Sequence, residues 1–176
     1  MRLIVNGVQR ELVSPPLTSL LQVLREELGI TSPKAGCQQG GCGACTILIE
    51  GRPRRACLTP LAAVDGAQVR TVEGLGAPTH LMPVQAAFDE HYAAQCGFCT
   101  SGFLMASQAL IESGGGSDRA EVIEALSGHV CRCTGYVKIV AAITAAAAGD
   151  VHPDATEADM GPQGEDAVTM IPGSPA

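Results

Sequence analysis

Four cysteines in the first third of the chain constrain its fold more than any other feature. Three of them lie in one glycine-rich loop with the spacing C-x4-C-x2-C, and the fourth follows later. This spacing is typical of plant-type [2Fe–2S] ligation. Glycines let such a loop curl at positive φ and leave amide N–H groups free to face the sulfurs. The sequence therefore predicts a [2Fe–2S] site held by Cys37, Cys42, Cys45 and Cys57.

A second group of four cysteines lies in the C-terminal half, as a C-x2-C pair and a C-x-C pair. Each pair precedes a predicted helix, whose N-terminal amides and partial positive charge stabilise thiolates. Taken alone, this set suits zinc about as well as an iron–sulfur cluster, although C-x-C is an unusual spacing for zinc. Beside a plant-type loop, a second [2Fe–2S] cluster is the favoured interpretation for Cys96, Cys99, Cys131 and Cys133.

Composition and charge exclude several classes of function. The net charge of −7 argues against a nucleic-acid partner. No run of 18 apolar residues is present, so we expect no membrane-spanning helix. The N-terminus lacks a secretory pattern, so we expect a cytoplasmic protein whose eight cysteines bind metal rather than form disulfides.

Hydrophobic periodicity predicts an α+β fold in two domains and a tail. In residues 1–76 we expect hairpins over 1–13 and 46–58, a helix over 18–28 and a short strand over 69–72. The second strand of the second hairpin would bring Cys57 back toward the loop. Residues 77–150 show four helical patterns, expected over 82–92, 101–112, 119–126 and 137–148, after a linker at 73–78. Residues 151–176 hold four prolines, five acidic residues and no Lys or Arg, so we expect a disordered tail or an arm that wraps around a partner.

Two stretches around the second group of cysteines resemble a known family. Gln95-Cys-Gly-Phe-Cys-Thr-Ser-Gly102 and Cys131-Arg-Cys-Thr-Gly-Tyr136, behind a loop ending Cys-Gly-Ala-Cys45, are similar to the small iron–sulfur subunit of the xanthine oxidase family of molybdenum hydroxylases. The resemblance covers about residues 1–150. It implies an N-terminal plant-ferredoxin-like β-grasp domain and a C-terminal four-helix [2Fe–2S]-binding bundle.

The resemblance also implies a role for each cysteine. Cys37, Cys42, Cys45 and Cys57 would ligate the cluster that faces FAD, and the second four would ligate the cluster near molybdenum. Gln95 and Cys133 match positions beside the molybdopterin, where the glutamine hydrogen-bonds the pterin. The chain departs from the family at three places: Gln39 stands where Glu is usual, Ser101 where Pro is usual, and His129-Val130 where Asn-Leu is usual.

The implied partners are a large subunit that binds molybdopterin, as its cytosine dinucleotide, and a medium subunit that binds FAD, in a dimer of heterotrimers. The chain would relay single electrons from molybdopterin to FAD during hydroxylation of a small substrate, and would hold no catalytic residue itself. An N-heteroaromatic substrate is favoured, with aldehydes, purines, carbon monoxide and an aromatic thioester left open. Two other hypotheses are a free-standing ferredoxin-like carrier and a zinc-stabilised interaction module. We expect His129 to lie near the ligands or at the surface, not to be a ligand.

Overall fold

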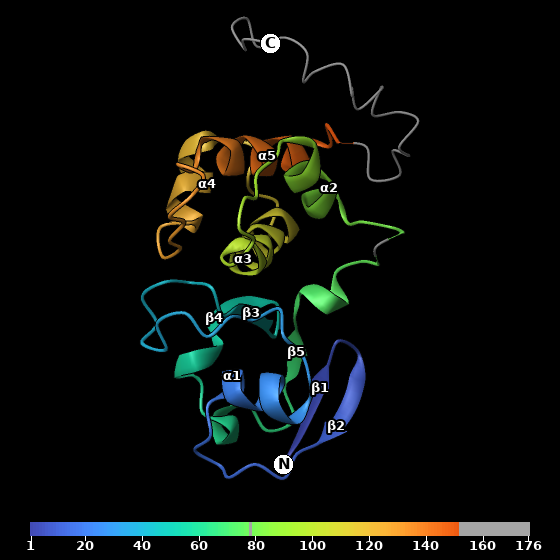
Figure 1. Ribbon diagram of the computed structural model, residues 1–176. Coiled ribbons are helices and arrows are strands. Elements are labelled where there is room, and N and C mark those ends of the chain that lie inside the picture. Colours follow the sequence, from blue (N-terminus) through green and yellow to red (C-terminus); the bar gives the residue numbers. More distant parts are fainter. Residues whose placement is uncertain (78, 152–176) are drawn as a thin grey trace, which may run out of the picture.

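The computed structural model describes residues 1–77 and 79–151, and has the expected α+β architecture (Figure 1). Nearly all of the expected tail, from residue 152 onward, lies outside these residues. The N-terminal half forms a five-stranded mixed sheet in the order β2-β1-β5-β3-β4. Only the β1–β5 pair is parallel among the described strands. The strands are β1 (Arg2–Val5), β2 (Val8–Glu11), β3 (Thr46–Ile49), β4 (Arg52–Arg55) and β5 (Gln68–Arg70).

The first hairpin forms as its turn residues predict. Asn6 and Gly7 both have positive φ, at 51° and 80°, which is the backbone of a two-residue type I′ turn. The turn fixes the register so that Val5 pairs with Val8. Leu3 and Val5 then face the interior, where they are 0% and 2% exposed.

The helix expected over 18–28 is present but changes its geometry after one turn. Ser19 caps α1 (Leu20–Gln22) by accepting a hydrogen bond from the Gln22 N–H at 3.3 Å. A π-helical turn follows over Val23–Glu27, in which the Leu28 N–H donates to the Val23 carbonyl five residues earlier. The apolar spacing predicted which face is buried, but it does not determine which carbonyl accepts each hydrogen bond.

Strand β3 is buried on both faces. Ile47 packs in the N-terminal core with the helix, whereas its neighbour Leu48 packs in the core of the helical half. Successive side chains of a strand point to opposite faces, so these two adjacent residues serve different domains. The continuous apolar run of β3 is the pattern of a strand covered on both sides.

Up to residue 151, the C-terminal half contains four helices at the expected places. Asp118 caps the third of them by accepting from the Ala120 N–H. The helix that follows the C-x2-C pair runs through the middle: it contacts β3 on one side and the other three helices on the other (Figure 1). Its residues 101–108 are therefore all buried. The helices are α2 (Pro83–Glu90), α3 (Thr100–Glu112), α4 (Arg119–Ala125) and α5 (Val137–Ala148).

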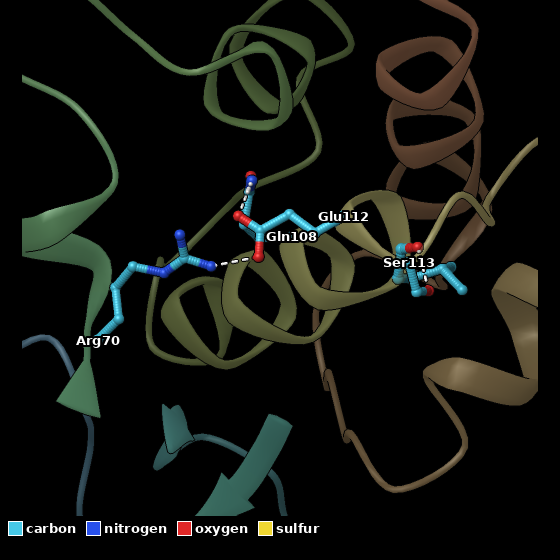
Figure 2. Close-up of polar contacts among 5 residues, drawn as sticks. Arg70, Gln108, Glu112 and Ser113 are labelled. Carbon is cyan, nitrogen blue, oxygen red and sulfur yellow. Dashed lines mark hydrogen bonds and ion pairs between the residues drawn. The ribbon is translucent and has the colours of Figure 1, made fainter. Parts of the chain in front are cut away.

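The two halves also meet at an ion pair near the surface. Arg70 at the end of β5 donates to the carboxylate of Glu112 in the last turn of α3, and Gln108 donates to the second oxygen of that carboxylate at 2.9 Å (Figure 2). The Arg70 side chain is 34% exposed and that of Glu112 is 38% exposed. Within the described residues no helix has the length and apolarity needed to cross a bilayer.

Candidate metal centres

The first group of cysteines lies on a tightly curled loop and on the segment after β4. Positive φ values at Gln38, Gly40 and Gly43 curl this loop. Cys45 is 2% exposed just before β3. The expectation that Cys57 lies in the second strand of the hairpin was wrong: β4 ends at Arg55, and Cys57 lies in a 3-10 turn over Ala56–Leu58.

The sulfurs of this first group approach one another in pairs. The Cys42 thiol lies next to the Cys37 sulfur, whose pKa it helps to lower, and the Cys57 thiol lies next to that of Cys45, whose pKa it affects. Cys42 also contributes to raising the pKa of Cys45, so the two pairs lie near each other. The structure therefore gathers the four predicted ligands as two adjacent pairs.

The second group is assembled from the starts of two helices. Cys99 is the cap residue of α3, and Cys131 and Cys133 lie in the loop before α5. The sulfur atoms of Cys96 and Cys133 are 3.6 Å apart. The thiol of Cys99 lies next to that of Cys131, because each affects the pKa of the other. Cys96 also contributes to raising the pKa of Cys99, and Cys131 to raising that of Cys133, so the two pairs lie near each other.

A ring of hydrogen bonds fixes the loop before α5. The Thr134 hydroxyl donates to the Cys131 sulfur at 3.0 Å, and the Thr134 N–H does so at 3.4 Å. The Cys131 N–H in turn donates to the Tyr136 hydroxyl at 2.9 Å. These contacts orient the Cys131 sulfur by hydrogen bonds, as the groups around a metal site orient its ligands.

Each group combines sulfurs of different acidity. The Gln39 N–H is the main cause that lowers the pKa of Cys37 to about 7, whereas burial raises the pKa of Cys45 to about 11. In the second group, burial and then the Cys131 thiol raise the pKa of Cys99 to about 12. Burial opposes ionisation of Cys131 too, but the hydrogen bonds from Thr134 outweigh it and lower the pKa. Buried thiols of this kind ionise when a metal binds them.

The paired arrangement fits two metal ions in each group. Two sulfurs on one tetrahedral ion, with bonds of about 2.3 Å, lie roughly 3.8 Å apart, which is close to the 3.6 Å between Cys96 and Cys133. In the described residues no three or more His, Cys, Asp or Glu side chains are arranged around a single ion. All eight cysteines are free. The donor set therefore fits a binuclear [2Fe–2S] cluster better than one zinc ion.

Gln95 and two of the sulfurs lie on an open edge of the helical domain. Gln95, Cys96 and Cys133 are all exposed. Phe98, between Cys96 and Cys99, is 48% exposed. This edge leaves the second group accessible to another molecule, whereas Cys131 on the inner side is 8% exposed.

A dense contact that we call the seam joins the two cysteine groups; it consists of Gly43, Thr46, Arg55, Gly102 and residues 128–130. Arg55 donates to the Thr46 hydroxyl and to the Gly128 carbonyl, and the Thr46 hydroxyl donates to the Gly43 carbonyl at 2.7 Å. A Cβ on Gly102 would lie 2.2 Å from the Gly43 oxygen. The backbones of the two domains therefore touch directly.

The seam explains where His129 lies. Its ring is buried, with Nε2 at 2.9 Å from the Thr46 hydroxyl. Burial, with a smaller contribution from Arg55, lowers the pKa of His129 to about 4, so the ring is neutral. The next residue, Val130, donates its N–H to the carbonyl of Cys42 at 3.0 Å. This hydrogen bond links the loop of one cysteine group to the loop of the other.

Sequence reasoning missed the two residues that organise the seam, Thr46 and Arg55. Arg55 precedes Cys57 by two positions, which is a weak hint. Its partner Gly128 is 73 residues away, so no local pattern could have paired them.

Comparison with known proteins gives the same division of the chain. Residues 3–71 match the model of the 2Fe-2S iron-sulfur cluster binding domain, and residues 71–144 match that of the [2Fe-2S] binding domain. The chain is 49% identical to the nicotine 6-hydroxylase small subunit of Paenarthrobacter nicotinovorans over 139 residues, which cover 79% of this chain and 84% of that protein. It is 40% identical to the nicotinate dehydrogenase small FeS subunit of Eubacterium barkeri, covering 79% of this chain and 88% of the relative.

Solved structures agree. One chain of quinoline 2-oxidoreductase from Pseudomonas putida superposes with a TM-score of 0.77 at 45% identity, covering 86% of this chain and 98% of that one. The chain belongs to the small [2Fe–2S] subunits of the molybdenum hydroxylases. The aldehyde oxidoreductase of Desulfovibrio desulfuricans contains the same fold as 17% of a longer chain, with a TM-score of 0.80. This small subunit is thus an electron-transfer component of a multi-subunit oxidoreductase.

Proposed function

We propose that Cys37, Cys42, Cys45 and Cys57 hold one [2Fe–2S] cluster and that the second four cysteines hold another. The observation that carries this proposal is the paired approach of the sulfurs within each group. When bound, such clusters supply one-electron redox chemistry, while the protein fixes their positions and tunes their potentials. The chain's own part is to hold eight sulfurs as thiolates and to keep the two groups in contact.

Exposure and contact support the order of the relay that the family resemblance implies. Gln95 and Cys133, on the open edge, would face the molybdopterin of a large subunit, with the Gln95 side chain as a hydrogen-bonding group for the pterin. Leu58, beside Cys57, is 60% exposed and offers an apolar contact on the outer side of the first group, where we place the FAD subunit. Between them, the hydrogen bond from Val130 to Cys42 supplies a short connection between the two loops. Electrons would therefore move from the second group to the first.

The assembly would contain a large molybdopterin subunit, with the cofactor as its cytosine dinucleotide, and a medium FAD subunit, arranged as a dimer of heterotrimers. We place the domain boundary at residues 76–77, close to the junction of the two matched families at residue 71. Eight free thiols suit a reducing compartment, so we propose a cytoplasmic location.

An N-heteroaromatic compound is the substrate class we favour for the complex. The relatives described above include subunits of enzymes named for nicotine, nicotinate and quinoline. An aldehyde is the second candidate, because aldehyde oxidoreductases share the fold and the sequence. The substrate pocket would belong to the large subunit, so only assays of the complex can separate these candidates.

Two cysteine variants of the assembled complex test both the ligands and the order of the relay. Cys133→Ser should abolish one of two [2Fe–2S] EPR signals and stop substrate from reducing FAD. Cys42→Ser should abolish the other signal and also stop FAD reduction, but substrate should still reduce the remaining cluster. That remaining reduction is the distinguishing result, because only the cluster next to molybdenum can accept electrons when the other is lost.

The same preparations exclude the alternatives. A zinc module would be colourless and contain no acid-labile sulfide. A free-standing carrier would purify without two larger chains. If FAD is reduced at the normal rate in Cys133→Ser, the proposed order is wrong.

A further inference from the structure

Arg55 bonds to both cysteine loops and to the strand between them. Its Nε donates to the Gly40 carbonyl at 3.3 Å, two residues before Cys42. Its Nη2 donates to the Gly128 carbonyl at 2.6 Å, three residues before Cys131. Nη1 donates to the Thr46 hydroxyl at the start of β3. A planar guanidinium can reach three acceptors in different directions at once, which a lysine ammonium on a flexible stem does less well.

The space around Arg55 is shaped for it. A Cβ on Gly128 would lie 2.4 Å from its Nη2, and one on Gly43 would lie 2.5 Å from the His129 ring and 2.8 Å from the Gly128 carbonyl. The Nε2 atom of the His129 ring lies 3.3 Å from Nη1. The Arg55 side chain is half-buried. Its hydrogen bonds to Gly40 and Thr46 are partly buried, and its bond to Gly128 crosses to the other domain at an exposed position.

The hydrogen bond that joins the two cysteine loops, between Val130 and Cys42, lies close to the carbonyls that Arg55 binds. The Val130 N–H meets the Cys42 carbonyl at 3.0 Å, so one loop connects to the other through Val130 and Cys131. Gly40 and Gly128, the two carbonyls held by Arg55, each lie two residues before one partner of this hydrogen bond. A side chain that fixes both carbonyls limits how far the loops can separate.

We propose that Arg55 is a positioning residue for electron transfer between the two clusters. It ligates no metal; it holds the two cysteine loops at a fixed separation. The transfer moves one electron from one cluster to the other and forms or breaks no bond in the chain. This inference rests on the proposed function, because it needs both clusters to be present.

The test compares Arg55→Met and Arg55→Lys with Arg54→Met in the purified holoenzyme. Arg54 is the exposed neighbour on β4 and is the matched control. Iron and sulfide content and both EPR signals should be unchanged in all three variants. In the two Arg55 variants, the dipolar splitting between the reduced clusters should narrow. Electron arrival at the first-group cluster, followed by rapid-freeze EPR with substrate, should slow several-fold relative to Arg54→Met, because the rate of electron tunnelling falls exponentially with the distance between the clusters.

Several outcomes would overturn the proposal. One such outcome is that both Arg55 variants keep the wild-type dipolar splitting between the clusters and the wild-type rate of electron transfer between them. Loss of either EPR signal in both variants would show instead that Arg55 is needed to build a cluster. If Arg55→Met does not assemble, Arg55→Lys alone decides, because it keeps the charge and most of the stem. Failure of the proposed function is separate: it would appear in the wild-type enzyme as the absence of two signals.

Discussion

Two of the contacts between the domains differ in nearly every physical property. At the seam, Thr46 is 1% exposed, His129 is 7% exposed, and backbone touches backbone at Gly43 and Gly102. At the other contact, Arg70 and Glu112 form an ion pair whose side chains are about a third exposed or more (Figure 2). The first contact lies between the cysteine groups and the second lies away from them. The difference indicates that precise docking is concentrated where the two metal centres come together.

The largest expected effect comes from adding one methyl group to the seam. Gly102→Ala would place a Cβ 2.2 Å from the Gly43 carbonyl oxygen, a backbone atom that cannot rotate away. Overpacking of this kind costs about 3 kcal/mol, which should lower the Tm of the purified subunit by about 6–12 °C. Calorimetry measures this shift.

The control is Gly41→Ala, because Gly41 has no atom within 4 Å of the added Cβ. Its Tm should stay at the wild-type value. Equal Tm values for the two alanine variants would show that the domains do not approach as closely as described.

A smaller effect is expected from Thr46→Val, which keeps the shape of the side chain but removes the hydroxyl. The Gly43 carbonyl, Arg55 and His129 would each lose a buried partner. Leaving such groups unsatisfied costs about 2 kcal/mol, equivalent to a Tm decrease of about 4–8 °C.

Thr144→Val in α5 is the matched control, since the Thr144 hydroxyl bonds only within its own helix, to Val140, among the described contacts. Its Tm should change by less than about 2 °C. A larger loss in this control than in Thr46→Val would contradict the central place of the Thr46 hydroxyl.

The smallest effect is expected at the ion pair. Arg70→Gln should cost at most about 0.5 kcal/mol because the pair is exposed and screened by water and salt. Arg70 is the main cause that lowers the pKa of Glu112. A lowered carboxyl pKa stabilises the fold above the ordinary value of 4.5, and this contribution is lost as the pH falls through the lowered pKa.

The difference in Tm between wild type and Arg70→Gln should therefore be greatest near neutral pH and vanish in acid. Added salt should reduce it. Arg10→Gln, at an exposed position of β2, should show no such pH dependence. If the difference in Tm between wild type and Arg70→Gln increases as the pH falls, the effect does not come from Glu112.

Much of this fold follows from local signals in the sequence. Asn6-Gly7 determined a hairpin, Asp118 marked the start of α4, and the glycines at 114–116 marked the end of α3. Helix positions were predicted within two residues for all four C-terminal helices. These features depend on residues adjacent in the chain, which is why periodicity and capping rules find them.

The features that were missed depend on contacts between distant residues. Burial of Leu48 against the helical domain, rather than in its own, could not be read from β3 alone. The expectation that His129 lies near the ligands or at the surface did not foresee its burial against Thr46, 83 residues away. The 3-10 turn over Ala56–Leu58, which holds Cys57, was missed as well.

The close approach of Gly43 and Gly102 also determines which segments must be transferred together when chimeras of related subunits are made. A chimera that joins the sheet domain of one relative to the helical domain of another would cut the chain at the linker, far from the surface where the halves interlock. Even with a matched linker, the residues that face each other across the seam would then come from different proteins. Any transplant of the helical half must therefore carry its counterpart residues on β3, on β4 and in the cysteine loop.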